Sequence, residues 1–366
     1  MVVRLTELQR IRTSGARAVE GFRIDGLDLL AIPQLALDVP NSVPGMNAGD
    51  SNTDLLLMVR ENGQYVPFSA IAAPGGEDAE FFSIGERSFL AVASIRSGAG
   101  PYEYSTTSTI HEWSAGSFTA FQSVETHAAK QWKHWQIGDR HFLAMAQGVE
   151  LPHIPGPNRD SVIYEWDGSR FVEFQPIPSK WAYNWHPFRV DDSFFVAHAD
   201  HLEPSRLYRW DGEHFVVHQE LLEHAGRAFA SFERDGDHHL LVAGLAAPPV
   251  VMRWDGKHFV PQQELPGLGG REVRVIEHEG RLFVIRVNFI LGTPRDPEPE
   301  LTSQVYEWRD GALRVAAEFP TCGATDVEIV GVGADVEFVV TNSLSPLVRF
   351  ANDTVVYSMS TNGAGG

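Results

Sequence analysis

Apolar and polar residues alternate along most of the chain, in short stretches separated by Gly, Asp and Pro. One stretch, Ile163-Tyr-Glu-Trp-Asp-Gly168 followed by Phe171, places an Asp-Gly turn signal between two alternating segments. This pattern predicts a β-hairpin. The same hairpin recurs in five clear and two degenerate copies, which are Ile110–Phe118, Ile163–Phe171, Leu207–Phe215, Val251–Phe259, Val305–Gly311, Leu57–Tyr65 and Leu347–Val355.

A second alternating hairpin lies between successive copies of the first. It reads Glu77-Asp-Ala-Glu-Phe-Phe-Ser-Ile-Gly85 and then Ser88-Phe-Leu-Ala-Val-Ala93. Two hairpins supply four strands, and seven units of roughly 50 residues predict an all-β fold, a seven-bladed β-propeller with four antiparallel strands per blade. A pair of β-sandwiches or a β-solenoid is the alternative. The other copies of the second hairpin begin near Arg17, Lys130, Tyr183, Arg227, Arg271 and Thr325.

We name the strands of a blade A to D from the central channel outward. The second hairpin supplies strands A and B, and the Trp-Asp-Gly hairpin supplies C and D. Seven similar units predict one domain over residues 1–360, followed by a short polar tail over 361–366. Thr6–Ile11 and Thr354–Met359 both read like a strand D, and one of them must complete the last blade to remove its open edge. We expect the N-terminal segment to close the ring.

The repeated unit resembles a known family. Ser161–Ile177 is similar to the EAR repeat (epilepsy-associated repeat, also called EPTP), and so is Cys322-Gly-Ala-Thr-Asp-Val-Glu328 at the start of a strand A. The resemblance covers nearly the whole chain and implies a seven-bladed propeller. It also implies protein binding, because known members are largely extracellular protein-binding modules, and some hold a cation in the central channel.

Connection lengths distinguish the two faces of the predicted ring. The A–B and C–D turns are tight, whereas four B–C connections are long and rich in Pro and Gly. Loops of that length are usually functional or disordered. All four leave the face on which strand A begins, which we call the top face. The four connections are Pro33–Thr53, Ser94–Ser108, Gln147–Asp160 and Val287–Thr302.

Aligned copies of strand A predict two polar columns that line the channel, because residues two apart share a strand face. A converging set of charges with little access to water shifts pKa values and is typical of a functional site. Solvated polar residues that hold the blades together are the alternative. The first column is Ala18, Asp78, Gln131, Asn184, Ala228, Glu272 and Asp326, and the second is Glu20, Glu80, Lys133, His186, Ala230, Arg274 and Glu328.

Blades three and four add an unusual aromatic sector. They read Lys130-Gln-Trp-Lys-His-Trp135 and Lys180-Trp-Ala-Tyr-Asn-Trp-His186. Trp and Tyr combine apolar area with a polar group and suit an organic ligand. Trp132 and Trp185 also align with an apolar column, so a place in the core is the alternative for these two residues. The predicted ligand contacts are Trp181, Tyr183, Trp185, Trp132, His134, Arg271, Arg274, Asp326 and Glu328.

Composition narrows the classes of function. Asp and Glu total 48 against 29 Lys and Arg, and this net charge of −19 disfavours nucleic acid as a partner. The single cysteine, Cys322, excludes an internal disulfide and a cysteine-rich metal site. Met1–Arg17 lacks the apolar segment of a secretory signal, and no run of eighteen apolar residues predicts a membrane span. We expect a cytoplasmic monomer, and the four Lys among many Arg hint at a bacterial source.

Two functions from different classes fit these observations. The first is a non-redox enzyme that binds a small organic molecule at the channel mouth and performs acid/base-assisted cyclisation or C–C bond formation in specialised metabolism. The alternative is a non-catalytic protein-interaction scaffold that binds a partner through the top-face loops. No cofactor is required, although Asp78 and Asp326 could hold Ca²⁺ or Mg²⁺, and His198 and His201 have zinc-ligand spacing. The predicted catalytic residues are His186, Glu80, Lys133 and Asp78.

Overall fold

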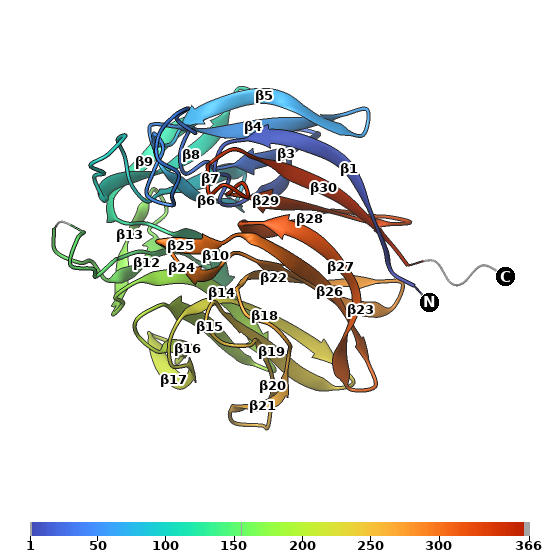
Figure 1. The fold of residues 1–366 in the computed structure, drawn as a ribbon. Coiled ribbons are helices and arrows are strands. Elements are labelled where there is room, and N and C mark those ends of the chain that lie inside the picture. The colour runs from blue at the N-terminus through green and yellow to red at the C-terminus, as the bar shows by residue number, and fades with distance from the viewer. Residues whose placement is uncertain (1, 155, 362–366) are drawn as a thin grey trace.

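A computed structural model describes residues 2–154 and 156–361 of the chain. Seven four-stranded antiparallel sheets form a ring, and the chain passes around it once from blue to red (Figure 1). The all-β, seven-bladed propeller predicted from the hairpin repeats is confirmed. Among the described residues, no helix is long and apolar enough to span a membrane. Residues 362–366 of the predicted tail over 361–366 lie outside the described residues, whereas its first residue, Thr361, is buried and donates a hydrogen bond to Glu279.

Each blade follows the predicted order from the channel outward. Blades 1 to 3 contain β2 (Glu20–Ile24), β3 (Leu27–Ile32), β4 (Asp54–Glu61), β5 (Gln64–Ala72), β6 (Gly76–Ile84), β7 (Arg87–Ser94), β8 (Ser105–Ser114), β9 (Ser117–His127), β10 (Gln131–Ile137), β11 (Arg140–Ala146), β12 (Ser161–Trp166) and β13 (Phe171–Ile177). Blades 4 and 5 contain β14 (Ala182–Val190), β15 (Ser193–Asp200), β16 (Ser205–Trp210), β17 (Phe215–Leu222), β18 (Gly226–Arg234), β19 (Asp237–Gly244), β20 (Val250–Trp254) and β21 (Phe259–Glu264). Blade 6 contains β22 (Gly270–His278), β23 (Arg281–Asn288), β26 (Glu300–Arg309) and β27 (Ala312–Cys322).

Blade 7 is assembled from both ends of the chain. It contains β28 (Ala324–Val332), β29 (Val336–Asn342), β30 (Asn352–Ser360) and, as its strand D, β1 (Arg4–Thr13). Strands β1 and β30 pair antiparallel from Arg4 with Ser360 to Thr13 with Asn352, so the preferred N-terminal closure is confirmed (Figure 1). The prediction of a hairpin over Leu347–Val355 is wrong. Residues 347–350 form a turn outside the strands, and the segment Thr354–Met359 belongs to strand C because its two edges pair with β29 and β1.

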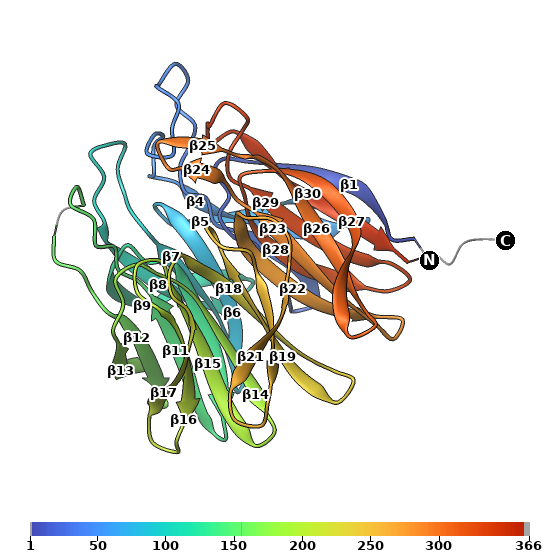
Figure 2. The same ribbon diagram turned by 60° about the horizontal axis from the view of Figure 1, so that its bottom comes forward.

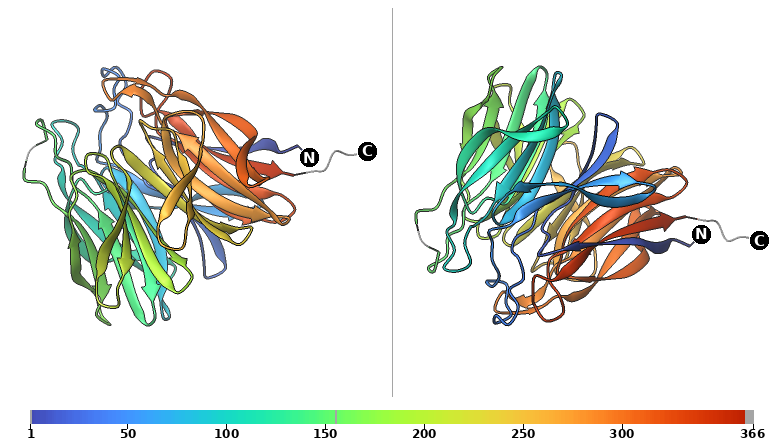
Figure 3. Two further views of the ribbon diagram at one scale, coloured as in Figure 1. Left: turned by 90° about the horizontal axis from the view of Figure 1, so that it is seen from below. Right: turned by 90° about the horizontal axis from the view of Figure 1, so that it is seen from above.

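Long connections gather on the top face. The loop over 33–53, the segments over 95–104, 147–154 and 156–160, and the connection between β23 and β26 project from the same side of the ring (Figure 2). That last connection forms a short hairpin of β24 (Leu291–Thr293) and β25 (Asp296–Glu298), which lies beside the 33–53 loop in both views of Figure 3. The A–B and C–D turns on the opposite face are tight, as predicted.

The core lies between blades. Strand A of each blade packs its apolar column against strands of the blade before it, so each cluster is shared by two sheets. Trp132 of blade 3 is fully buried with Phe82 and Phe89 of blade 2, and Trp185 of blade 4 is buried with Trp135 of blade 3. This arrangement gives seven small cores in series around the ring.

A glutamine on strand D links five of the seven pairs of neighbouring blades. The amide of Gln122 donates to the backbone carbonyl of Phe171 at 2.8 Å and accepts from its N–H at 2.9 Å. One side chain thus satisfies both the carbonyl and the N–H of Phe171. Four further pairs repeat this contact, namely Gln9 with Tyr65, Gln175 with Phe215, Gln219 with Phe259, and Gln263 with Leu313.

Candidate functional site

A β-bulge at the start of strand A turns consecutive side chains into the channel. In blade 2 the register shifts between Gly76 and Asp78, and the corresponding shift recurs in blades 4 to 7. Bulges of this kind redirect side chains. The extra residue adds a layer above the two predicted columns. We call it the mouth layer, and it consists of Arg17, Glu77, Lys130, Tyr183, Arg227, Arg271 and Thr325; the predicted columns below it are the middle and lower layers.

Residues of the middle layer bind backbone groups of the next blade. The carboxylate of Asp78 in blade 2 accepts the N–H of Trp132 in blade 3 at 2.9 Å. Gln131 accepts the N–H of Trp185 at 2.6 Å. Strand A is an inner edge whose N–H groups have no partner strand, so these side chains satisfy donors that would otherwise be exposed to the channel.

The lower layer repeats the same contact one step deeper. Glu80 accepts the N–H of His134 at 3.0 Å, and Glu20 accepts the N–H of Phe81 at 3.1 Å. His186 does so with a ring nitrogen, because its Nε2 lies 3.0 Å from the N–H of Ser231. Three of the predicted catalytic residues, Asp78, Glu80 and His186, therefore serve as connections between blades.

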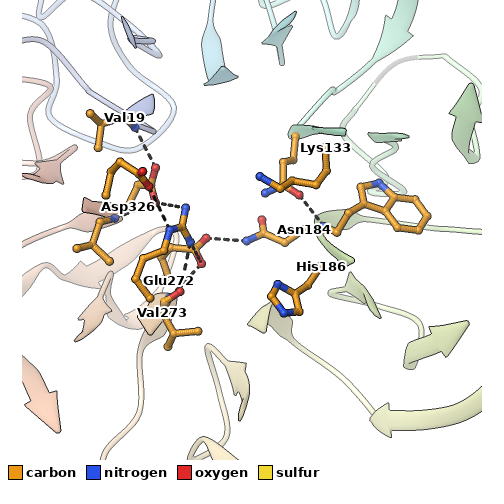
Figure 4. A network of polar contacts seen from close by, with 12 residues as sticks. Val19, Lys133, Asn184, His186, Glu272, Val273 and Asp326 are labelled. Atoms are coloured by element: carbon orange, nitrogen blue, oxygen red, sulfur yellow. Dashed lines mark hydrogen bonds and ion pairs between the residues drawn. The ribbon is translucent and has the colours of Figure 1, made fainter. Parts of the chain in front are cut away.

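Ion pairs join the remaining charges of the two layers. Lys133 lies 2.7 Å from Glu80, while Arg274 reaches Glu272 at 2.9 Å, Glu328 at 3.3 Å and Asp326 at 3.4 Å. Figure 4 shows Asp326 and Glu272 on one side of the channel facing Lys133 and His186 on the other. Small residues in blade 5 leave space for a link between blades 4 and 6, where Asn184 donates to Glu272 at 2.7 Å (Figure 4).

Burial shifts the pKa values of these groups. Burial raises the pKa of Asp326 to about 7, and Glu272 adds to the rise while Arg274 opposes it. Burial and Glu80 raise the pKa of Asp78 well above its usual range. Burial, with Lys133 and Arg274 nearby, lowers the pKa of His186 to about 3, so its imidazole stays neutral and can accept the Ser231 N–H.

The aromatic sector does not form an open pocket. Trp132 and Trp185 are buried between blades at 0% and 2% exposure, which supports their alternative assignment to the core. His134 points away from the channel, because it stacks on Phe82 at 4.5 Å and its Nε2 lies 3.1 Å from Nδ1 of His141. Trp181 packs edge-on against His201, with ring centroids 4.8 Å apart. Of this group only Tyr183 enters the channel, in the mouth layer.

Apolar residues from the top-face loops of several blades pack together above the mouth layer. We call this group the mouth cluster, formed by Leu35, Ala36, Phe289, Ile290, Leu344 and Phe350. It lies against the mouth layer, because the Arg17 guanidinium lies 5.3 Å from the Phe289 ring. A hollow of about 410 Å³ lies elsewhere, between blades 1 and 2, lined by residues that include Pro74, Thr107 and His111. In the described part of the chain, no group of three or more His, Cys, Asp or Glu is arranged to hold a metal ion.

Comparison with known sequences identifies the repeat. The model of the EPTP domain matches residues 117–167, 170–211 and 214–255. Residues 117–255 thus contain three EAR (EPTP) repeats. Each matched EAR unit begins on a strand D and ends after the next strand C, so it spans two blades. If each unit is counted from its strand D, the chain consists of seven D-A-B-C units. The first strand of the chain is therefore a strand D, and it closes the propeller by completing blade 7.

Two curated relatives share the EAR repeats. The human thrombospondin-type laminin G domain and EAR repeat-containing protein is 31% identical over 181 residues, covering 48% of this chain and 25% of that protein. The mouse protein of the same name is 32% identical over 145 residues, covering 38% of this chain and 20% of that protein. The alignments thus span a quarter or less of the relatives' length.

The prediction of acid/base-assisted cyclisation or C–C bond formation at the channel mouth is wrong. The EAR repeats and the EAR-containing relatives favour the alternative of the two functions. The geometry of this EAR propeller gives the physical reason, because His186, Glu80, Lys133 and Asp78 are already bound to backbone groups or counter-charges.

Part of the mouth layer is not predicted from the sequence. The repeat pattern marks Arg17, Glu77 and Lys130 as the beginnings of repeats and does not predict them as channel residues. Their shared place just before the first polar column was a signal, because all copies of the second hairpin begin at this position. Regular strand alternation predicts the wrong orientation for these residues, because it would turn Glu77 away from the face of Asp78.

Proposed function

We propose that this propeller is a non-catalytic protein-interaction module that binds a partner protein across its top-face loops. The observation that carries the proposal is an exposed apolar patch on that face. Val43 is 83% exposed and Leu347 is 71% exposed, and Leu37 and Val39 are exposed beside them. Exposed apolar groups that lie together commonly mark interaction sites.

The two loops that carry this patch hold each other in place. Arg349 in the 343–351 loop lies 3.0 Å from Asp38 in the 33–53 loop and donates to the Ser42 carbonyl at 3.0 Å. The N–H of Gly45 also donates to the Val348 carbonyl at 3.0 Å. A patch built on braced loops loses less conformational entropy on binding. Its apolar character favours a partner with a complementary apolar groove.

The family comparisons support the same reading, because EAR repeats occur in the curated relatives beside a laminin G domain. Such a multidomain setting is typical of interaction proteins. The monomeric state and the cytoplasmic location remain predictions, and so does the bacterial source.

A matched pair of double variants tests the proposal. Val43→Asp with Leu347→Asp alters the top face, and Val217→Asp with Val332→Asp alters apolar positions elsewhere that are also more than half exposed. Proteins retained from an extract of producing cells by immobilised wild type are identified, and affinity is then measured with the purified partner. We expect the top-face variant to bind more than about 10-fold more weakly, with the control unchanged. A partner that binds both variants equally would contradict the proposal.

A further inference from the structure

The mouth layer contains more positive charge than it can neutralise. Four cations, Arg17, Lys130, Arg227 and Arg271, share the layer with one carboxylate, Glu77, so the formal charge of these five side chains is 4 − 1 = +3. All five side chains are buried. Removing an unpaired charge from water is costly, so a buried group of this sign calls for a counter-charge.

Glu77 is fully engaged by two of the four cations. Arg17 binds it through two parallel hydrogen bonds of 2.7 and 2.8 Å, and Lys130 reaches it at 3.2 Å. Burial alone would raise the pKa of Glu77, but Arg17 and Lys130 lower it to about 2. The carboxylate therefore remains charged and is shared between partners, with no capacity left for Arg227 and Arg271.

Arg271 has no partner of its own. It is 5% exposed, and among the described residues it makes no ion pair and no side-chain hydrogen bond. Its guanidinium lies 5.3 Å from the centre of the Tyr183 ring, and the guanidinium of Arg227 lies 3.8 Å from the same ring. The Lys130 ammonium also lies 5.3 Å from it. Three cations thus lie around one phenol ring. Burial alone would raise the pKa of Tyr183, but Arg227, Lys130 and Arg271 outweigh this effect and lower it.

Arg227 is only partly satisfied. Its Nη1 donates to the Gly226 carbonyl and lies 3.1 Å from His201 Nδ1, and both partners are neutral. Burial lowers the pKa of Arg227 to about 10, and the like charges of Arg271 and Arg17 add to the effect. Asp200 is the other carboxylate whose field reaches Arg227, but it accepts backbone N–H groups of Lys180, Trp181, Leu202 and Glu203.

We infer that the mouth layer is a binding site for a small inorganic oxyanion of the sulfate or phosphate type, held by Arg271, Arg227 and Lys130. Guanidinium groups present paired donors that match the oxygens of such anions. The mouth cluster lies against the layer through the contact of Phe289 with Arg17, and its apolar side chains offer no hydrogen bonds to a larger polar ligand. The bound anion would offset most of the positive charge of the layer and hold blades 3, 5 and 6 together.

The inference is tested by thermal unfolding at constant ionic strength, with chloride replaced stepwise by sulfate or phosphate. Wild type should show a rise in Tm that saturates at about 3 °C or more. Arg271→Gln should lose the saturating rise, and in chloride alone it should melt at or above the wild-type temperature because like-charge repulsion is relieved. Arg23→Gln, at an exposed position, should behave as wild type. A general salt effect would be linear and equal in all three proteins, and that result would overturn the inference.

A second measurement covers the case in which Arg271→Gln does not fold. Arg271→Lys keeps the charge but not the paired donors, so its Tm rise should saturate at higher sulfate concentration. Crystals of wild type grown in sulfate should show tetrahedral density between Arg271 and Arg227. A water-filled channel at the same concentration would refute the site.

Discussion

The carboxylate of Asp326 in blade 7 accepts a hydrogen bond from the backbone N–H of Val19 in blade 1 at 2.9 Å, across 307 residues of sequence. Together with the pairing of β1 and β30, this contact closes the ring. It shows what the polar channel residues do, since the same contact joins Asp78 with Trp132 and Gln131 with Trp185. The channel is an inner set of connections between blades.

Asp326 should impose a pH dependence on stability. Its pKa is about 7 in the folded protein and about 3.9 in an unfolded chain. Between these values the folded protein binds the extra proton, so stability falls as pH rises from about 4 to 7. Asp326→Asn should flatten the slope by at most about 1.4 kcal/mol per pH unit, measured by urea unfolding at several pH values. Asp139→Asn, at an exposed position, should leave the slope unchanged, and parallel curves for Asp326→Asn would contradict the assignment.

Titration of His186 should change the stability of the protein with pH in the opposite direction. Its pKa is about 3 in the folded protein and about 6.5 when unfolded, so the unfolded chain binds the extra proton between these values. Stability is therefore lost as pH falls below about 6.5. His186→Gln keeps an acceptor for Ser231 and should lose less stability between pH 6.5 and 5 than wild type does. His224→Gln serves as an exposed control, and an equal acid sensitivity of wild type and His186→Gln would count against a buried neutral imidazole.

Much of this architecture can be predicted from sequence, because the information is local. Hairpin signals such as Asp167-Gly168 recur with a regular spacing, and the lengths of the connections identify the elaborated face. The channel layers were harder to predict. Whether Glu77 faces the channel depends on a bulge that appears only in the register between β6 and β7.

The mouth cluster could not be predicted for a different reason. Its members lie just beyond strand B in separate blades or in loops without a repeat pattern, such as Leu35, Phe289 and Phe350. Their contact depends on closing the ring. Likewise, Trp132 and Trp185 have the composition of a ligand pocket, and only the packing between blades shows that they are core.

The glutamine links should contribute measurably to stability. Gln263→Ala leaves the N–H and carbonyl of Leu313 without their partner, and we expect a loss of roughly 1–2 kcal/mol in the free energy of unfolding. The adjacent Gln262 is exposed and makes one hydrogen bond to Gly311, so Gln262→Ala should cost less than about 0.5 kcal/mol. Equal losses in chemical denaturation would show that the paired contact has no special role.

A second matched pair tests the backbone of the D–A connections. The Gly75 carbonyl accepts the Ile95 N–H, and the Ala225 carbonyl accepts the Leu245 N–H in the same way. Gly75 has a φ of +55°, and an added Cβ would lie 2.2 Å from the Arg96 carbonyl oxygen. Gly75→Ala should therefore destabilise the protein by about 2 kcal/mol or more.

Ala225 adopts the same left-handed conformation with a φ of +60°. Ala225→Gly removes the strain of a side chain there and should change stability by no more than about 1 kcal/mol in either direction. Differential scanning calorimetry of both variants measures the contrast. A mild effect of Gly75→Ala would mean that the close approach to Arg96 is absent in solution.

The channel residues hold the blades together, and we propose that the top-face loops bind the partner. The affinity of the purified partner for two variants, measured at a temperature where both are folded, separates these two roles. We predict that Glu80→Gln with Lys133→Gln, which removes the ion pair without changing net charge, has a lower Tm and wild-type affinity. Val43→Asp with Leu347→Asp should keep its Tm and lose affinity by more than about 10-fold. A folded channel variant that loses the partner, with the top-face variant still binding, would contradict the account.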